Sequence, residues 1–268
     1  ITSEYKGITS EVTYFVPLNC LYELWKVRIT NNSSRKRNLS GFTYQEYAAT
    51  WNALDDLLNL QYVQYTAQMK VIDGIIDHGT NVNIPPMPDN FEEKDQGRHT
   101  FQAVVGARII GYDTNREVFI GPYRSYSNPI AVEKGKCNNS LAYGDNPCGS
   151  LQFEIILEPG QSQDFLVIVG IGKADEEGKR IAAEYKNLSK ADDELVRLKE
   201  YWHTRIKGLT AETPDPLLNS MINMWSIYNC MITFAWSRAA SLIYTSSERD
   251  GLGYRDTVQD FLGPMHAI

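Results

Sequence analysis

A short segment near the C-terminal end of the chain combines charged side chains, an amide and two glycines. It runs from Arg249 to Asp260 and has the sequence RDGLGYRDTVQD. Arginine offers a fork of donors and aspartate offers paired acceptors, which together complement the neighbouring hydroxyls of a sugar. Glycine lets the backbone turn, or approach a ligand, where a side chain would clash. The segment predicts a sugar-binding loop, and a network of salt bridges among the same charges is the alternative interpretation.

A further arginine precedes this segment. Arg238 lies in the run WSRAAS, residues 236–241, which follows a long apolar stretch. The combination of WSR, a short spacer and RxGLGYRDTxQD resembles glycoside hydrolase family 94, the inverting disaccharide phosphorylases that act on cellobiose, laminaribiose or chitobiose. Three upstream runs are similar to the N-terminal domain of that family: NPIAVE at 128–133, GKCNNS at 135–140 and CGSL at 148–151. The resemblance covers most of the chain.

The resemblance implies a reaction and a set of sugar contacts. In an inverting phosphorylase, inorganic phosphate attacks the anomeric carbon while one carboxylic acid protonates the leaving oxygen, so a second catalytic carboxylate is unnecessary. The family's contacts to the non-reducing sugar, in the −1 subsite, fall here on Arg238, Arg249, Arg255 and Asp256. Gln259 and Asp260 would share a helical face with Asp256, and we expect them to cap or brace the loop.

The resemblance also implies what this chain should lack. The general acid of the family lies in an Asp-Trp-Asn-Asp segment further downstream, as do the phosphate-binding residues, and no such segment occurs here. The sequence begins at Ile1 without Met and stops at Ile268 inside a helical pattern. We therefore expect a piece of a longer enzyme that is inactive alone. Its expected partners are a disaccharide, phosphate as co-substrate, the remainder of the same enzyme and a second copy in a homodimer, with no cofactor.

The composition of the chain argues against several classes of function. The chain has 268 residues, 43% of them hydrophobic, and a formal net charge of −7. That charge argues against nucleic-acid binding, which favours a basic face. No apolar run approaches the ~20 residues that span a bilayer, and no signal peptide is recognisable, so we expect a cytoplasmic protein without membrane contact. The four cysteines lack Cys-x-x-Cys spacing and the four histidines are scattered, so we expect no metal site.

Alternating apolar residues and turn signals predict strands over about residues 8–172. The clearest runs are Glu11–Val16, Leu21–Thr30, Leu151–Glu158 and Asp164–Ile171. In the second run, Trp25, Val27 and Ile29 fall on one face, as in an antiparallel strand. The loop of residues 159–163 predicts a hairpin between the last two runs. Residues 83–97, rich in proline and acidic residues, predict an exposed loop. Many short strands separated by turn-forming residues favour a β-sandwich.

Helical patterns follow the strands. Residues 175–186 and 190–207 predict two amphipathic helices. Asp215 and Pro216 predict an N-cap and first helical residue, and residues 217–236 predict an apolar helix buried in a barrel. With the resemblance, we expect a β-sandwich domain over 1–172 that lacks its N-terminal part, a helical linker over 173–212 and the start of an (α/α)6 catalytic barrel over 213–268.

Two other functions remain open from the sequence. One is an inverting glycoside hydrolase on a related barrel, in which water replaces phosphate and a second carboxylate acts as base. The other is a non-catalytic carbohydrate-binding module. Phosphate dependence separates the first alternative from a phosphorylase, and sugar binding without turnover would indicate the second.

Overall fold

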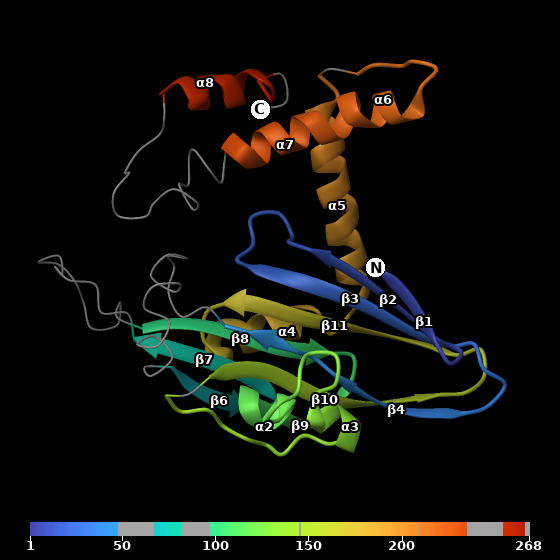
Figure 1. Ribbon diagram of the computed structural model, residues 1–268, viewed down its shortest axis with the longest axis vertical. Coiled ribbons are helices and arrows are strands. Elements are labelled where there is room, and N and C mark those ends of the chain that lie inside the picture. Colours follow the sequence, from blue (N-terminus) through green and yellow to red (C-terminus); the bar gives the residue numbers. More distant parts are fainter. Residues whose placement is uncertain (48–66, 82–96, 145, 209, 235–253, 266–268) are drawn as a thin grey trace, which may run out of the picture. The chain divides into compact units, whose positions relative to one another are not determined.

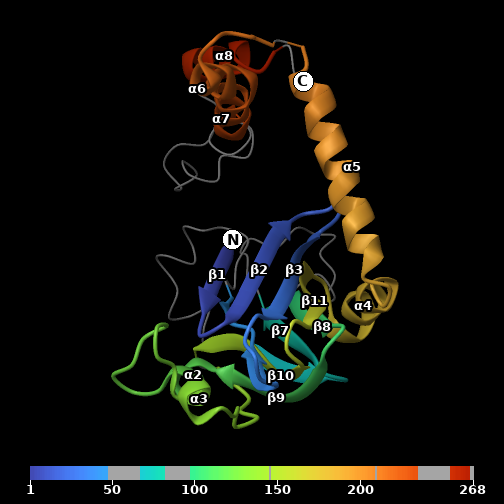
Figure 2. The same ribbon diagram turned by 90° about the vertical axis from the view of Figure 1, so that its right-hand side faces the viewer.

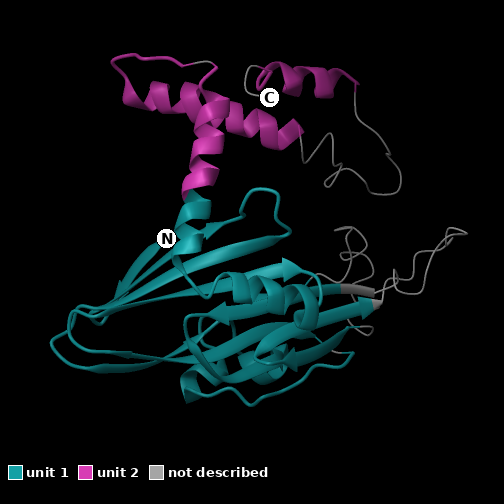
Figure 3. Ribbon diagram, turned by 180° about the vertical axis from the view of Figure 1, so that it is seen from behind, with its two compact units in different colours: residues 1–50, 59–195 teal, residues 51–58, 196–268 magenta. Residues whose placement is uncertain are grey.

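A computed structural model describes residues 1–47, 67–81, 97–144, 146–208, 210–234 and 254–265. The chain divides into two units, which Figure 3 shows in different colours. Unit 1 comprises residues 1–50 and 59–195, and unit 2 comprises residues 51–58 and 196–268. The predicted loop over residues 83–97 lies outside the described residues except for Gly97, the first residue of a strand.

Unit 1 contains a large antiparallel sheet (Figure 1). Its described strands, in spatial order, are β1 (Thr2–Tyr5), β2 (Ile8–Phe15), β3 (Tyr22–Asn31), β11 (Ser162–Ile171), β8 (Gly97–Val105), β7 (Ile75–Asn81) and β6 (Gln68–Ile72). Strand β11 pairs with β3 on one side and β8 on the other. A strand from the end of unit 1 therefore joins two sets of strands that come earlier in the chain.

A smaller antiparallel sheet of unit 1 is organised around one long strand. Strand β10 (Pro147–Leu157) pairs with β4 (Arg37–Phe42), β5 (Gln45–Glu46) and β9 (Arg108–Asn115). The antiparallel, sheet-rich architecture predicted from the alternating pattern is confirmed. The observed strands β2 and β3 match the predicted runs to within a few residues.

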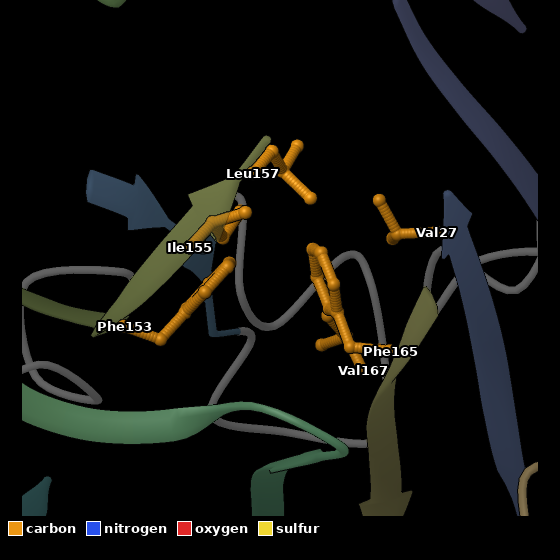
Figure 4. Close-up of a cluster of buried hydrophobic side chains, with 6 residues drawn as sticks. All are labelled: Val27, Phe153, Ile155, Leu157, Phe165 and Val167. Atoms are coloured by element: carbon orange, nitrogen blue, oxygen red, sulfur yellow. The ribbon is translucent and has the colours of Figure 1, made fainter. Parts of the chain in front are cut away.

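Side chains from both sheets meet in one buried cluster (Figure 4). Alternate residues of β10 point inward, among them Phe153, Ile155 and Leu157, because successive side chains of a strand face opposite sides. Phe165 of β11 meets Phe153 edge to face, with ring centroids 4.7 Å apart. Complete burial of such a side chain contributes about 1.5–3 kcal/mol. This cluster fixes which face of each strand is interior.

The predicted hairpin between β10 and β11 is wrong. The loop at residues 159–163 does connect them, but β10 belongs to the smaller sheet and β11 to the larger one. Both strands carry an apolar face, and these two faces pack against each other across the cluster instead of lying side by side in one sheet. The turn signals do mark a connection, but the pairing partner of each strand is set by distant sequence.

Two short helices, α2 (Arg116–Ile120) and α3 (Ile130–Lys134), cover the N-terminal part of the other face of β10, where Cys148 lies (Figure 2). Asn115 caps α2, since its side chain accepts a hydrogen bond from the Val118 backbone N–H at 3.1 Å. Cys137 and Cys148 pack in this layer as free, buried thiols. Burial raises the pKa of Cys137 to about 12, which leaves a poor nucleophile.

The predicted amphipathic helices are present. The first comprises a π-helical segment, η2 (Ala174–Gly178), and α4 (Lys179–Glu184), and the second is α5 (Ser189–Ile206). Buried Asp77 of β7 accepts a hydrogen bond from the Ala174 backbone N–H at 2.7 Å and binds His99 of β8 at 2.8 Å. The first contact attaches the helical segment to the large sheet, and the second holds the same carboxylate against the neighbouring strand.

Unit 2 is helical where it is described. After the unit 2 part of α5 come α6 (Pro216–Ser220), a π-helical segment η3 (Met221–Trp225), α7 (Ser226–Ile232) and α8 (Tyr254–Leu262). The predicted cap is confirmed, because Asp215 accepts from the Leu217 and Leu218 backbone N–H groups and Pro216 begins the helix. None of the described helices is long and apolar enough to cross a membrane.

The expected burial of the apolar helix after Pro216 is not observed among the described residues. Met221, Met224 and Trp225 are each about half exposed, and Ile227 is the one buried aliphatic or aromatic side chain of described unit 2. The periodicity indicated an apolar helix correctly. Burial needs a second surface, and the described residues of unit 2 supply one over only a small area around Trp202 and Tyr228.

Candidate functional site

Two of the four predicted sugar contacts lie in the first turn of α8. The Arg255 Nε and Nη2 atoms are each 3.4 Å from Oδ1 of Asp256, which is longer than a strong charge-assisted hydrogen bond. The Arg255 side chain is 82% exposed and that of Asp256 is 43% exposed. An exposed pair at this distance contributes little to stability.

The position of α8 is set at its C-terminal end. Phe261 contacts Phe234 of the preceding helical segment, with ring centroids 5.7 Å apart. Beyond the helix, Gly263 lies against Cys230 of α7, where an added Cβ would be 2.6 Å from the sulfur. These contacts hold the far end of α8 and leave Arg255 and Asp256 at its opposite end.

The helix geometry separates the two secondary candidates. Asp260 follows Asp256 by four residues and is half-buried on the same face, as expected for a bracing residue. Gln259 follows Arg255 by four residues and is exposed. The expectation that both share the face of Asp256 therefore fits Asp260 better than Gln259.

Sequence reasoning missed Thr257. Its Oγ1 atom is buried and has no hydrogen-bond partner in the described part of the chain. A buried hydroxyl without a partner costs free energy, so it marks a position where another donor or acceptor would be favourable. Its place directly after Asp256 in the RDT run was the available signal.

The other predicted contacts, Arg238 and Arg249, lie outside the described residues, as does His266. The structure therefore brings together Arg255 and Asp256 only. These two can donate to and accept from a pair of sugar hydroxyls, and the negative Asp256 is favoured in the first turn of α8 by the helix dipole. The arrangement supports ligand orientation, and contains no acid positioned against a nucleophile among the described side chains.

The described residues contain no cluster of metal-ligating side chains. No group of three or more His, Cys, Asp or Glu side chains lies close enough to hold an ion there. Asp77 and His99 form a pair, and His78 is buried beside Tyr47, with ring centroids 4.6 Å apart. Burial lowers the pKa of His78 to about 4, so it is neutral at physiological pH.

Comparison with known proteins gives two family matches and several relatives. The model "Glycosyl hydrolase 94, supersandwich domain" matches residues 1–188, and "Glycosyl hydrolase 94 superfamily, catalytic domain" matches residues 201–268. An N,N'-diacetylchitobiose phosphorylase of Vibrio furnissii is 35% identical over 98% of this chain and 31% of its own length. The Vibrio proteolyticus enzyme of the same name has the same identity and coverage. A solabiose phosphorylase of Paenibacillus borealis is 23% identical over 96% of this chain and 30% of its own length.

The two matches follow one another along the chain, and together they take in both the sandwich and the segment that carries Arg255 and Asp256. The chain spans about a third of the length of these curated relatives. The chain belongs to glycoside hydrolase family 94.

Proposed function

We propose that this chain is part of an inverting disaccharide phosphorylase, which converts a β-linked disaccharide and inorganic phosphate into an α-sugar 1-phosphate and a monosaccharide. The observation that carries the proposal is the 35% identity to two N,N'-diacetylchitobiose phosphorylases over nearly the whole chain. The chemistry of Arg255 and Asp256 on α8 supports it, because these side chains suit the hydroxyls of a sugar.

In this proposal the residues of the chain orient the sugar. Asp256 accepts hydrogen bonds from hydroxyls of the non-reducing sugar in the −1 subsite, and Arg255 donates to them. Arg238 and Arg249 complete the set by their place in the family pattern. Asp260 supports Asp256 from the same helical face. Fixed hydrogen bonds of this kind accelerate a reaction by holding the anomeric carbon in line with its attacking group.

The general acid and the phosphate pocket belong to the remainder of the enzyme in this proposal. Phosphate is a co-substrate, and no cofactor is required by the chemistry. We also propose a β-sandwich domain over 1–172, a linker over 173–212 and the beginning of an (α/α)6 barrel over 213–268. A homodimer in the cytoplasm completes the proposal, with no nucleic-acid or membrane partner.

The names of the relatives rank the candidate disaccharides. The two relatives at 35% identity are named for N,N'-diacetylchitobiose, whereas the relative at 23% identity is named for solabiose. A relative from Paenibacillus borealis at 27% identity is named for 3-O-β-D-glucopyranosyl-β-D-glucuronide. We place N,N'-diacetylchitobiose first, with cellobiose and laminaribiose as the alternatives that the sequence pattern raised.

The test measures sugar 1-phosphate released by the full gene product from each of these disaccharides, with and without phosphate. Release that requires phosphate supports the proposal, and the fastest substrate identifies the linkage. Free monosaccharides formed without phosphate would instead indicate an inverting glycoside hydrolase. Sugar binding without any turnover would indicate a carbohydrate-binding module.

A further inference from the structure

Unit 1 has a hollow of about 250 Å³ beside the loop that connects α2 and α3. Aromatic side chains from two distant segments line it, namely Phe42 and Tyr44 around β4 and β5, and Phe119 and Tyr126 around α2. The loop is residues 121–129, and it leads into the NPIAVE run noted in the sequence. Neither the sandwich core nor the proposed contacts on α8 explain this hollow.

The floor of the hollow is rigid. Tyr44 stacks on Phe119, with ring centroids 5.2 Å apart and an interplanar angle of 21°. Phe42 adds a tilted contact to Phe119 at 6.3 Å. Phe119 is buried in the layer that covers β10. Aromatic rings held in this way present a fixed apolar surface.

The wall of the hollow is Tyr126, which is 61% exposed. Its ring lies 5.7 Å from that of Tyr44 at an angle of 57°. The Arg116 guanidinium covers Tyr126 at 5.5 Å from the ring centroid, and Nη2 of Arg116 donates to the Tyr126 hydroxyl at 3.2 Å. Tyr126 is therefore held in place although it faces solvent.

One carboxylate is held by two of the tyrosines that line the hollow. Glu46 accepts three hydrogen bonds at Oε1, from the Tyr44 hydroxyl at 2.7 Å, the Tyr126 hydroxyl at 2.9 Å and the Arg116 Nε at 2.7 Å. Its Oε2 receives no hydrogen bond from any described residue, and the side chain is 43% exposed. Burial raises the pKa of Glu46, but these hydrogen bonds outweigh it, so the pKa lies below its ordinary value. Glu46 thus offers an ionised acceptor to solvent.

The loop beside the hollow is braced internally. The Ser125 backbone N–H and hydroxyl both donate to Oδ1 of Asn128 at 3.2 Å, and Arg124 binds the Asn128 carbonyl and the Glu133 carboxylate. Tyr123, at the loop tip, has φ of +59°, a left-handed conformation that is uncommon outside glycine. A loop held by its own hydrogen bonds loses little conformational entropy when a ligand binds.

We propose that this hollow is a second carbohydrate-binding site, which takes one pyranose ring against Tyr44 and Tyr126 and accepts a hydrogen bond from a ring hydroxyl at Oε2 of Glu46. The negative faces of aromatic rings attract the C–H groups on a sugar ring. Binding pockets commonly combine an apolar wall with a few placed polar groups, as this one does. The inference rests on the residues of unit 1, and only the choice of probe sugars rests on the proposed function.

A proline-rich peptide is another ligand class that packs on exposed aromatic side chains. Proline has no backbone N–H, so such a peptide offers few donors to an ionised carboxylate. A pyranose carries hydroxyl donors around an apolar ring face. The oriented Glu46 therefore favours the sugar.

The test is hydrogen–deuterium exchange of the full gene product, titrated with cellobiose and with N,N'-diacetylchitobiose. Either sugar should slow exchange in peptides that cover residues 116–134. Glu46→Gln removes the charge and should weaken this protection about tenfold, which corresponds to the contribution of one hydrogen bond to a charged group. Tyr126→Ala should weaken it at least as much.

Matched controls keep the result specific. Glu154→Gln and Tyr5→Ala change exposed residues elsewhere in the sandwich and should leave the protection unchanged. Asp256→Asn should also leave it unchanged, since the site does not use α8. The inference is overturned if neither sugar protects residues 116–134 from exchange. It is also overturned if the protection depends on protein concentration, or if it persists in both Glu46→Gln and Tyr126→Ala. Phosphorolysis is measured separately, so protection without turnover would contradict only the proposed function.

Discussion

The two units treat apolar side chains in opposite ways. Unit 1 buries them between its sheets and beneath α2 and α3, in clusters that include Phe153, Leu157 and Phe119. The described helices of unit 2 bury Ile227 and leave Leu217, Met221 and Trp225 about half exposed or more. Both patterns were visible in the sequence as apolar periodicity. Periodicity thus identifies an apolar face, whereas burial depends on a second surface that packs against it.

Truncating one phenylalanine in each unit should change stability by very different amounts. Phe153→Ala should lower the opening free energy of unit 1 by about 3–5 kcal/mol, because it leaves a cavity in a packed core. Phe261→Ala, which truncates an exposed ring of α8, should cost about 1 kcal/mol or less. Native-state hydrogen exchange, read on peptides of each unit, measures both. Equal losses would contradict the contrast between the units.

A second prediction concerns the chemistry of unit 2. Asp256→Asn should lower kcat/KM of the full gene product about 100-fold or more, near 2.7 kcal/mol, because the amide disturbs the acceptor pattern offered to the sugar. Exchange in α8 should not change. Asp260→Asn is the matched control on the same face and should reduce kcat/KM far less. A large effect of Asp260→Asn with a small one of Asp256→Asn would reverse the proposed roles.

A third prediction uses the polar interior of unit 1. Burial, with a smaller contribution from His99, lowers the folded pKa of His78 to about 4, against an ordinary value of 6.5. Between these values the unfolded state binds the proton and the folded state does not, so stability falls as pH falls. From pH 7 to pH 5 the loss should be about 2 kcal/mol.

Denaturant midpoints at the two pH values measure this loss in wild type, in His78→Gln and in the matched control His203→Gln. The control lies on α5 and should keep the wild-type dependence. NMR titration of the His78 ring measures its pKa independently. A pKa near the ordinary value of 6.5 would show that His78 does not cause the loss of stability.

The smallest expected effect is at the surface of unit 1. Arg28 binds Asp164 through two hydrogen bonds of 2.7 and 2.8 Å, which hold the pKa of Asp164 below its usual range. Both side chains are substantially exposed, so Asp164→Asn should cost less than about 1 kcal/mol and less still in high salt. Thermal unfolding at two salt concentrations measures it. A salt-independent loss of several kcal/mol would contradict the interpretation of Arg28 and Asp164 as an exposed, screened ion pair.

Local signals in the sequence were sufficient for much of the fold. Alternation placed Trp25, Val27 and Ile29 on one face of β3, and all three pack on the inter-sheet cluster. Asp215 and Pro216 located the start of α6, because a cap acts within one turn. The pairing of β10 and β11 could not be obtained in this way, since either strand fits a hairpin equally well until the distant partner strands are known.

The candidate site was predicted in part. The run around Arg255 and Asp256 was found from residue types and a family pattern, and the structure places both in the first turn of α8. Thr257 was missed, because an unpaired buried hydroxyl is a property of surroundings and not of spacing. The hollow at Tyr44 and Tyr126 was missed for a related reason. Its walls come from segments about 80 residues apart, which ring contacts and the hydrogen bonds at Glu46 bring together.

The central position of β11 determines when the large sheet can form during synthesis. Strand β11 lies between β3 and β8, and Ser162 pairs with Thr30. During synthesis the strands β1–β3 and β6–β8 emerge first, each set with one inner edge unpaired until β11 arrives. The large sheet cannot close while the ribosome is still adding residues before Ser162. Until then both edges are open to pairing with other chains, so the partly synthesised sheet is exposed to aggregation.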